Sequence, residues 1–177
     1  MTIISFTGFS GTGKSTIASS LSLDNNYFYI SFNSIVHKIA SDFNLSAYEY
    51  LEKYGISKAS KNANDTILFL IRKYDGNIVL DGLYDINLAK VLRSHHDWHA
   101  ITINISSQRY LRIMRIAQRK QLDMIKAGDV CAKRDSYKLS IGIRSIIKSS
   151  DMQVANDTTP LFAVQKCGMY VNTMMRR

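Results

Sequence analysis

Eight residues near the start of the chain have the types and spacing needed to hold a triphosphate. Residues 8–15 read Gly-Phe-Ser-Gly-Thr-Gly-Lys-Ser. The glycines let the backbone curl so that successive N–H groups point at phosphate oxygens. In this pattern Lys14 reaches the β- and γ-phosphates, and the Ser15 hydroxyl can ligate Mg²⁺. The pattern therefore predicts a site for a nucleoside triphosphate.

The residues on either side of this loop favour the same interpretation. An apolar, strand-like run precedes it at Thr2–Thr7, and a helix-like run begins at Lys14. A helix that starts at the loop places its N-terminal N–H groups against the anion. This context disfavours the alternative of a glycine-rich turn that binds no nucleotide. The residues expected to bind ATP are Gly8, Ser10, Gly11, Thr12, Gly13, Lys14, Ser15 and Thr16.

A second acidic element follows a later apolar run. The strand-like segment Asn77–Leu80 is followed directly by Asp81. An acid at the tip of a strand beside a phosphate loop reaches Mg²⁺, usually through water. Asp81 is therefore the predicted metal partner of Ser15. Asp85, four residues later, is either the N-cap of the next helix or a second carboxylate near the acceptor hydroxyl.

The net charge of +9 is concentrated in one part of the chain. Residues 109–148 contain eleven Lys and Arg residues but three Asp residues, which leaves +1 for the rest of the chain. Such a stretch forms either a solvated basic face or a surface that faces an anion. Because the chain also has a triphosphate to hold, we favour the second interpretation. DNA is one candidate partner, since phosphate contacts dominate affinity for DNA.

Other bulk properties indicate a cytoplasmic protein, or one in the host cytoplasm if the protein is viral. Cys131 and Cys167 lack the C-x-x-C spacing and are expected to be reduced thiols. No run is apolar and long enough to span a bilayer, so no membrane partner is expected. A cleavable signal peptide is not expected either, because the first residues already form a strand. The sequence leaves the oligomeric state unknown.

Apolar periodicity predicts alternating strands and helices over the whole chain. The strand-like runs are Thr2–Thr7, Tyr27–Ser31, Asn77–Leu80, Ala100–Ile105 and Met152–Ala155. The helix-like stretches are Lys14–Ser22, Ser34–Phe43, Ala47–Tyr54, Asn62–Tyr74, Ile86–Ser94, Gln108–Ile125, Ala132–Ser149 and Pro160–Met174. This alternation predicts an α/β fold with a five-stranded parallel sheet and helices on both faces. Ligands of such sheets bind outside the carboxyl ends of the strands, where the glycine-rich loop lies.

Two polar segments are predicted to connect these elements. They are Ser57–Asn64 and Gln121–Val130. Each is either a simple surface loop or part of a cap or lid that closes over the donor phosphate and excludes water.

Together these segments resemble the nucleoside monophosphate kinase group of P-loop kinases, in particular its dephospho-coenzyme A kinase-like and archaeal adenylate kinase-like branches. The matching segments are residues 8–15, residues 79–83, the arginines at 112, 115 and 119, residues 134–135 and 142–143, and residues 152–157. The resemblance implies a three-layer P-loop NTPase fold and a single kinase domain over residues 1–177. It also implies an acceptor cap over about residues 33–64 and an Arg-rich lid over about residues 119–134.

The resemblance also implies roles for individual residues. Arg119 and Arg134 are the expected lid arginines, because a guanidinium grips phosphate oxygens bidentately. Asn156 lies in the loop where such kinases hold the adenine ring. The implied activity is an ATP- and Mg²⁺-dependent transfer of the γ-phosphoryl group to a nucleotide or nucleotide-like acceptor. Its implied catalytic residues are Lys14, Asp81, Arg119 and Arg134.

The chain departs from this family on the acceptor side. The family often follows the Asp-Gly pair with Pro-Arg, which holds the acceptor phosphate, whereas residues 83–85 are Leu-Tyr-Asp here. Where related kinases place an acid after the second strand, residues 32–34 are Phe-Asn-Ser. Asn33 can hydrogen-bond an acceptor but cannot take its proton. Asn33 and Asp85 are the candidate acceptor contacts.

Two alternatives to this activity remain. A kinase that phosphorylates a hydroxymethylated base within DNA would use the basic stretch 109–148 to bind its substrate. A P-loop ATPase or nucleotide-binding switch would have no transfer acceptor at all.

Two further clusters each have two interpretations. A histidine-rich turn forms either a surface loop, which we favour, or a zinc site; its residues are His95, His96, Asp97 and His99. An aromatic group either packs a capping helix, which we favour, or stacks on an acceptor base; its residues are Phe43, Tyr48, Tyr50 and Tyr54.

Overall fold

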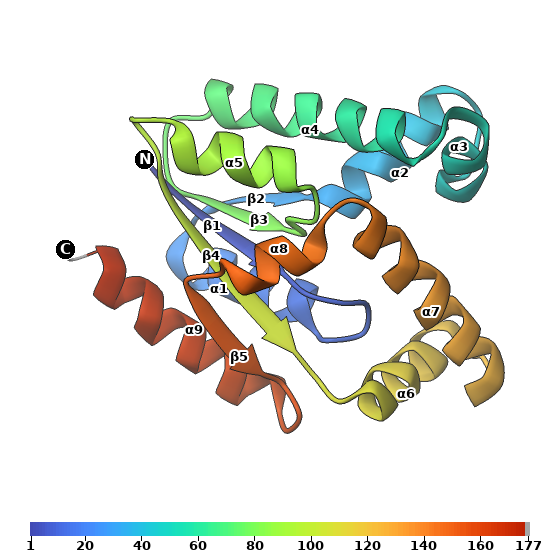
Figure 1. Cartoon of the computed structure of the whole chain (residues 1–177). Helices are drawn as coiled ribbons and strands as arrows, with labels where there is room; N and C mark the ends of the chain where they lie inside the picture. The colour runs from blue at the N-terminus through green and yellow to red at the C-terminus, as the bar shows by residue number, and fades with distance from the viewer. Residues whose placement is uncertain (176–177) are drawn as a thin grey trace.

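The computed structural model describes residues 1–175, which form one parallel sheet covered by helices on both faces (Figure 1). The strands are β1 (Thr2–Thr7), β2 (Phe28–Ser31), β3 (Ile78–Asp81), β4 (His99–Ser106) and β5 (Met152–Ala155). Their order in the sheet is β2-β3-β1-β4-β5, and every neighbouring pair is parallel. The predicted fold class is therefore confirmed.

The helices follow the strands in alternation. They are α1 (Lys14–Asn25), α2 (Phe32–Asp42), α3 (Ala47–Tyr54), α4 (Ile56–Lys73), α5 (Ile86–Ser94), α6 (Arg109–Lys120), α7 (Met124–Ser140), α8 (Ile143–Lys148) and α9 (Pro160–Met175). Among the described residues, no helix is both long enough and apolar enough to cross a membrane.

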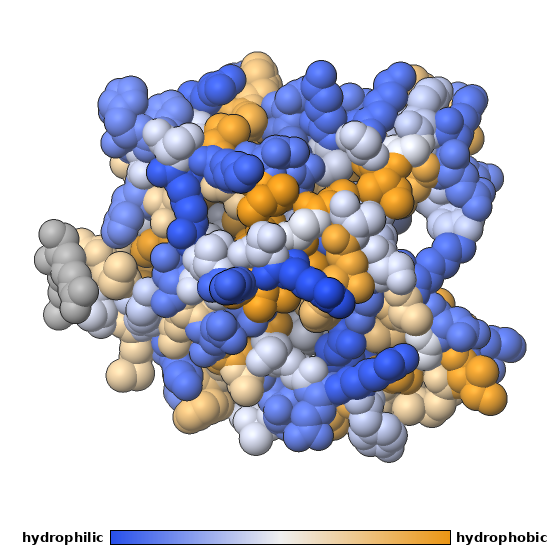
Figure 2. All heavy atoms as spheres, in the orientation of Figure 1, coloured by the Kyte–Doolittle hydropathy of each residue, from blue (hydrophilic) through white to orange (hydrophobic). Residues whose placement is uncertain are grey.

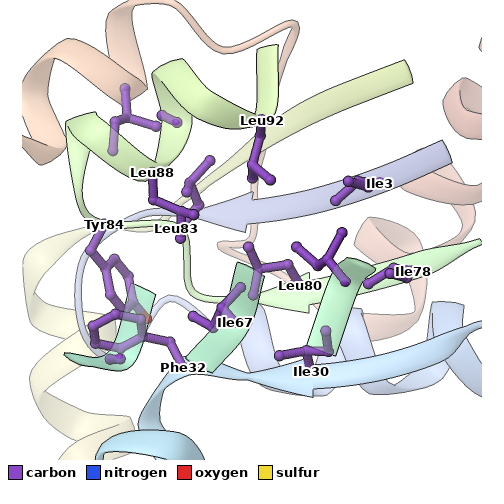
Figure 3. Close-up of a cluster of buried hydrophobic side chains, with 14 of the residues drawn as sticks. Ile3, Ile30, Phe32, Ile67, Ile78, Leu80, Leu83, Tyr84, Leu88 and Leu92 are labelled. Carbon is purple, nitrogen blue, oxygen red and sulfur yellow. The ribbon is translucent and has the colours of Figure 1, made fainter. Parts of the chain in front are cut away.

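Both faces of the sheet are buried, because successive side chains of a strand point to opposite sides. Ile3 of β1 packs in a cluster with residues of α2, α4, α5 and α8, whereas the adjacent Ile4 packs with α1 and α9. Figure 3 shows the first cluster, with Ile67 of α4 and Leu88 of α5 against the strands. This double coverage explains why all six residues of β1 are buried.

The two helices of the predicted lid region differ from the sequence prediction. A single helix over Gln108–Ile125 is wrong, because α6 ends at Lys120 and Gln121 adopts a left-handed conformation with φ of 53°. A connection over Gln121–Val130 is also wrong, because the carboxylate of Asp123 accepts a hydrogen bond from the backbone N–H of Lys126 and starts α7. The predicted helix Ala132–Ser149 is interrupted as well, by Gly142 with φ of 95°.

The polar segment Ser57–Asn64 is not a connection, because it forms the first half of α4. The sequence analysis predicted a connection because most side chains of this segment are polar. Ser60 and Asn64 lie one helical turn apart, and both are buried together with the alanines that precede them. A polar stripe that faces the interior of a protein looks like an exposed loop in the sequence.

Candidate active site

The glycine-rich loop lies at the carboxyl end of β1, directly before α1, as the sequence predicts. It packs closely on helix α6. A Cβ atom on Gly11 would lie 2.6 Å from the backbone oxygen of Arg112, and Gly11 has φ of 80°. Ser15 and Thr16 are exposed in the first turn of α1, where backbone N–H groups are free to face an anion.

Lys14 is buried beneath this loop, with 5% of its surface exposed. Its Nζ atom donates to the backbone oxygen of Phe9 at 2.8 Å and to Oγ1 of Thr12 at 3.3 Å. Burial lowers the pKa of Lys14 to about 8, and the nearby carboxylates of Asp81 and Asp135 oppose this effect. The ammonium is thus held by neutral oxygens that phosphate oxygens can replace.

Asp81 ends β3 opposite Phe6 of β1 and is buried. Its Oδ2 atom accepts a hydrogen bond of 2.8 Å from the Tyr29 hydroxyl, whose pKa is raised first by burial and then by Asp81. The other oxygen, Oδ1, has no hydrogen-bond partner within residues 1–175. A buried carboxylate oxygen of this kind fits Mg²⁺ or a water that Mg²⁺ holds, since hard cations prefer oxygen ligands.

Lys138 of α7 is a second buried lysine at the loop, which the sequence analysis missed. Its Nζ atom donates to the backbone oxygen of Gly8 at 3.3 Å and lies 4.2 Å from the ring centroid of Tyr84. Its pKa is well below the usual value because of burial and, next, the neighbouring charge of Lys14. The residues next to Lys138 in the sequence do not distinguish it from the exposed charged residues of the same helix.

A buried ion pair connects helices α6 and α7 to the loop. Arg112 of α6 donates to Oδ2 of Asp135 of α7 at 2.8 Å and to the backbone oxygen of Ser10 at 3.1 Å. The other oxygen of Asp135 accepts the backbone N–H of Ser10 at 3.1 Å. Arg112 therefore has a structural role, because it holds α6 and α7 against the loop. Arg115 donates to the backbone oxygen of Asn156 at 2.8 Å.

The two predicted lid arginines, Arg119 and Arg134, both lie at the surface. The pKa of Arg134 is lowered by burial and then by the charge of Arg119. Within residues 1–175 neither forms a salt bridge. Both guanidiniums are thus available to an anionic ligand.

Asn156 is buried behind the loop. Its Nδ2 atom donates to the backbone oxygen of Thr12 at 2.8 Å, and its Oδ1 atom has no partner among the described residues. The Asn156 side chain thus stabilises the glycine-rich loop from its buried side. Contact between this segment and the adenine ring remains a prediction.

The side chain of Asp85 connects α4 and α5. Its Oδ1 atom accepts the backbone N–H of Asn87 at 2.8 Å, so the N-cap interpretation is confirmed for α5. Its Oδ2 atom accepts the hydroxyl of Ser60 on α4 at 2.5 Å. Burial and the Asp85 charge raise the pKa of Tyr137, on α7, to about 12. Asn33, the other candidate, is exposed in the first turn of α2.

The aromatic group divides into two parts. Tyr50 is 1% exposed and its ring centroid lies 4.9 Å from that of Tyr54, which confirms the packing interpretation for these two. Phe43 is 51% exposed, with its ring centroid 5.6 Å from that of Tyr50. Tyr48 is half-exposed and reaches the lid, where its hydroxyl accepts from Nζ of Lys133. Figure 2 shows polar side chains around a hollow between α3 and α7, on the right of the molecule.

The histidine-rich turn lies at the amino ends of the strands, away from the loop. His95 stacks on Trp98 with ring centroids 3.8 Å apart, and the exposed His96 pairs with Asp97 at 3.2 Å. The turn follows α5 and precedes β4, in agreement with a surface loop. His95, His96 and Asp97 have ligand atoms within 4.8 Å of one another, whereas His99 begins the strand.

Two relatives cover most of the chain. A "UPF0200 protein" of Methanococcus vannielii is 27% identical over 165 residues, which are 89% of this chain and 88% of the relative. A "Cytidylate kinase" of Sulfurisphaera tokodaii is 29% identical over 133 residues, which are 75% of this chain and 71% of the relative. No protein-family model matches the chain.

Solved structures share the fold over nearly the whole length. Shikimate kinase from Aquifex aeolicus has a TM-score of 0.65 and 18% identity, and the match covers 96% of both chains. Shikimate kinase from Bacteroides thetaiotaomicron has a TM-score of 0.70 and 13% identity, covering 97% of this chain and 98% of the other. The resemblance to P-loop kinases is therefore confirmed, with the three-layer fold of this group.

Proposed function

We propose that this protein is an ATP- and Mg²⁺-dependent phosphotransferase that moves the γ-phosphoryl group to a nucleotide or nucleotide-like acceptor. The observation that carries the proposal is the position of Lys14, held at the loop by neutral oxygens and close to the carboxylate of Asp81. The similarity to a protein named cytidylate kinase supports the same class of reaction.

In this proposal the cations of the site act on the donor phosphates. Lys14 leaves the oxygens of Phe9 and Thr12 and binds the β- and γ-phosphates. Arg119 and Arg134 close from the lid onto the transferring group. Phosphoryl transfer requires little covalent chemistry from the protein, so positioning and charge stabilisation supply most of the rate.

Ser15 and Asp81 are the residues that would hold Mg²⁺, with Asp81 acting through water. The ion supplies positive charge to the phosphate oxygens as the bond to the leaving ADP breaks. The free Oδ1 atom of Asp81 and the exposed Ser15 hydroxyl are hard oxygen donors that suit this ion.

The test is transfer of label from γ-labelled ATP to a panel of nucleotides, nucleosides and DNA, in the presence of Mg²⁺. We expect a labelled product that depends on the acceptor and that Lys14→Met abolishes. Unchanged transfer by the variant would contradict the role of Lys14. Full ATP hydrolysis without an acceptor, and no labelled product, would instead favour a P-loop ATPase or switch.

A second candidate is a kinase for a hydroxymethylated base within DNA, and the surface charge of the lid region favours it. Among the charged residues of 109–148, eight cations are exposed against two acids, Asp123 and Asp129. The cations are Arg109, Arg119, Lys120, Lys126, Lys133, Arg134, Arg144 and Lys148. A DNA substrate predicts activity that falls steeply between about 50 and 200 mM salt. A flat salt response with turnover of free nucleotides would exclude this candidate.

A further inference from the structure

We propose that the group phosphorylated is an uncharged hydroxyl of a nucleoside-like acceptor, free or within a polynucleotide, and not the phosphate of a nucleoside monophosphate. Ser60, Asn64 and Asp85 would select this acceptor. The inference rests on the phosphotransferase function proposed above and specifies the acceptor for the same site.

The charge of the acceptor side is the first argument. Asp85 is buried there, with 8% of its surface exposed. No arginine precedes Arg72, so α2, α3 and the first half of α4 supply no guanidinium. Their lysines are all exposed, and Lys38 is already paired with Asp42 at 2.8 Å. A doubly charged phosphate monoester would meet the buried carboxylate of Asp85 and no buried cation from these helices.

The direction of the hydrogen bonds is the second argument. Ser60 has a single hydroxyl hydrogen, which it donates to Oδ2 of Asp85. Its Oγ atom can therefore only accept a further hydrogen bond, as can both oxygens of Asp85. A hydroxyl or an N–H group of a ligand can donate to these atoms. An ionised phosphate cannot, because its oxygens only accept.

Asn64 supplies the third argument. It lies one helical turn after Ser60 on α4 and is 8% exposed, and its side-chain Oδ1 atom has no hydrogen-bond partner within residues 1–175. A buried amide without a hydrogen-bond partner destabilises a fold. The presence of Asn64 at this position is therefore best explained by a ligand that forms the missing hydrogen bond. A neutral sugar or base edge offers both the donors and the acceptors that an amide needs.

The reaction that follows is balanced without any further reagent. The acceptor oxygen forms a bond to the γ-phosphorus, while the bond from phosphorus to the β,γ-bridging oxygen breaks and its electron pair leaves with ADP. The hydroxyl proton is released to water. At about pH 8.5, phosphorylation of a hydroxyl thus releases acid, whereas phosphorylation of an ionised phosphate monoester releases none, because the phosphates of both products are already ionised.

The experiment compares matched acceptors in weak buffer at about pH 8.5 with a pH indicator, Mg²⁺ and ATP, and identifies products by mass spectrometry. One arm contains nucleosides and hydroxymethylated oligonucleotides, and the other contains the corresponding nucleoside monophosphates. We expect acid release and a phosphomonoester in the first arm. Nucleoside diphosphates in the second arm, with no product in the first, would overturn the inference but uphold the phosphotransferase. No product in either arm would overturn both.

Variants then test two of the three selecting residues, Asp85 and Asn64. Asp85→Asn keeps an N-cap oxygen for α5 but removes the charge, and Asn64→Leu removes the amide. For both we expect the KM of the acceptor to rise about tenfold and the KM of ATP to change less than about twofold. Thermal unfolding of Asn64→Leu should occur at or above the wild-type temperature, because it removes an unpaired buried polar group.

Asp65→Asn is the matched control, because Asp65 is exposed on the same helix beside Asn64. It should change neither KM. An unchanged acceptor KM in Asp85→Asn and Asn64→Leu, or equal effects on both substrates, would show that these residues do not select the acceptor.

Discussion

The carboxylate of Asp135 accepts the backbone N–H of Ser10 at 3.1 Å, although 125 positions separate the two residues. The same carboxylate pairs with Arg112. A helix of the lid region is thereby joined to the phosphate loop through a charged group with 16% of its side chain exposed. Arg119 and Arg134, by contrast, form no salt bridge within residues 1–175.

Asp135→Ala should lower the free energy of unfolding by about 3–5 kcal/mol, because it leaves Arg112 buried without its partner. Asp42→Ala removes an exposed ion pair and should cost less than about 1 kcal/mol. Denaturant unfolding of both variants measures the difference. Equal losses of unfolding free energy in the two variants would contradict the conclusion that the buried Arg112–Asp135 pair stabilises the fold more than the exposed pair does.

ATP binding at about pH 8.5 should take up protons. The pKa of Lys14 is about 8 in the free protein, so less than half of its amine is charged at that pH. Negative phosphate oxygens raise this pKa, and the amine then binds a proton. Calorimetry in two buffers of different ionisation enthalpy measures the uptake. Lys14→Met should reduce it, and an uptake that is the same in this variant would exclude Lys14 as its source.

Lys14 should also destabilise the nucleotide-free protein in a pH-dependent way. Its pKa is about 8 in the folded protein and 10.5 in the unfolded chain. Between these values the unfolded chain binds more protons, so the cost of burying Lys14 falls as the pH rises. Lys14→Met should be more stable than wild type by at most about 3 kcal/mol below pH 8. The advantage should shrink towards about pH 10.5, as urea unfolding across this range would reveal.

Gly11→Ala should weaken ATP binding and lower stability by more than about 1 kcal/mol, because a Cβ atom would meet the backbone of Arg112 in a left-handed conformation. Gly128→Ala is the control. A Cβ atom on Gly128, inside α7, meets nothing within 4 Å, so this change should stabilise the protein by about 0.5–1 kcal/mol. If both variants lost stability equally, the loss in Gly11→Ala could not be assigned to the clash with the backbone of Arg112.

The donor half of the site could be predicted from the sequence because its signals are local. The loop at residues 8–15 and the strand before it are adjacent in the chain, and Asp81 follows its own apolar strand directly. Each pattern therefore contains most of the information that determines its structure.

The contacts of Lys138 and Asp135 could not be predicted, because they depend on how the lid packs against the loop. Lys138 donates to the backbone oxygen of Gly8, which lies 130 positions earlier in the chain. Neither Lys138 nor Asp135 differs in residue type from exposed residues on α7. Ser60 was missed for a related reason. Its hydroxyl faces Asp85 inside the protein, yet a polar helix face has the same composition whether it meets water or a ligand.

The contact between Tyr48 and Lys133 describes the resting state of this protein. The Nζ atom of Lys133 on α7 lies 3.8 Å from the ring centroid of Tyr48 on α3, and both side chains are exposed. An exposed cation–π contact contributes about 0.5–1 kcal/mol, which corresponds to a preference of only about two- to fivefold for the paired side chains over the separated ones. This contact alone therefore does not hold α3 against α7 permanently.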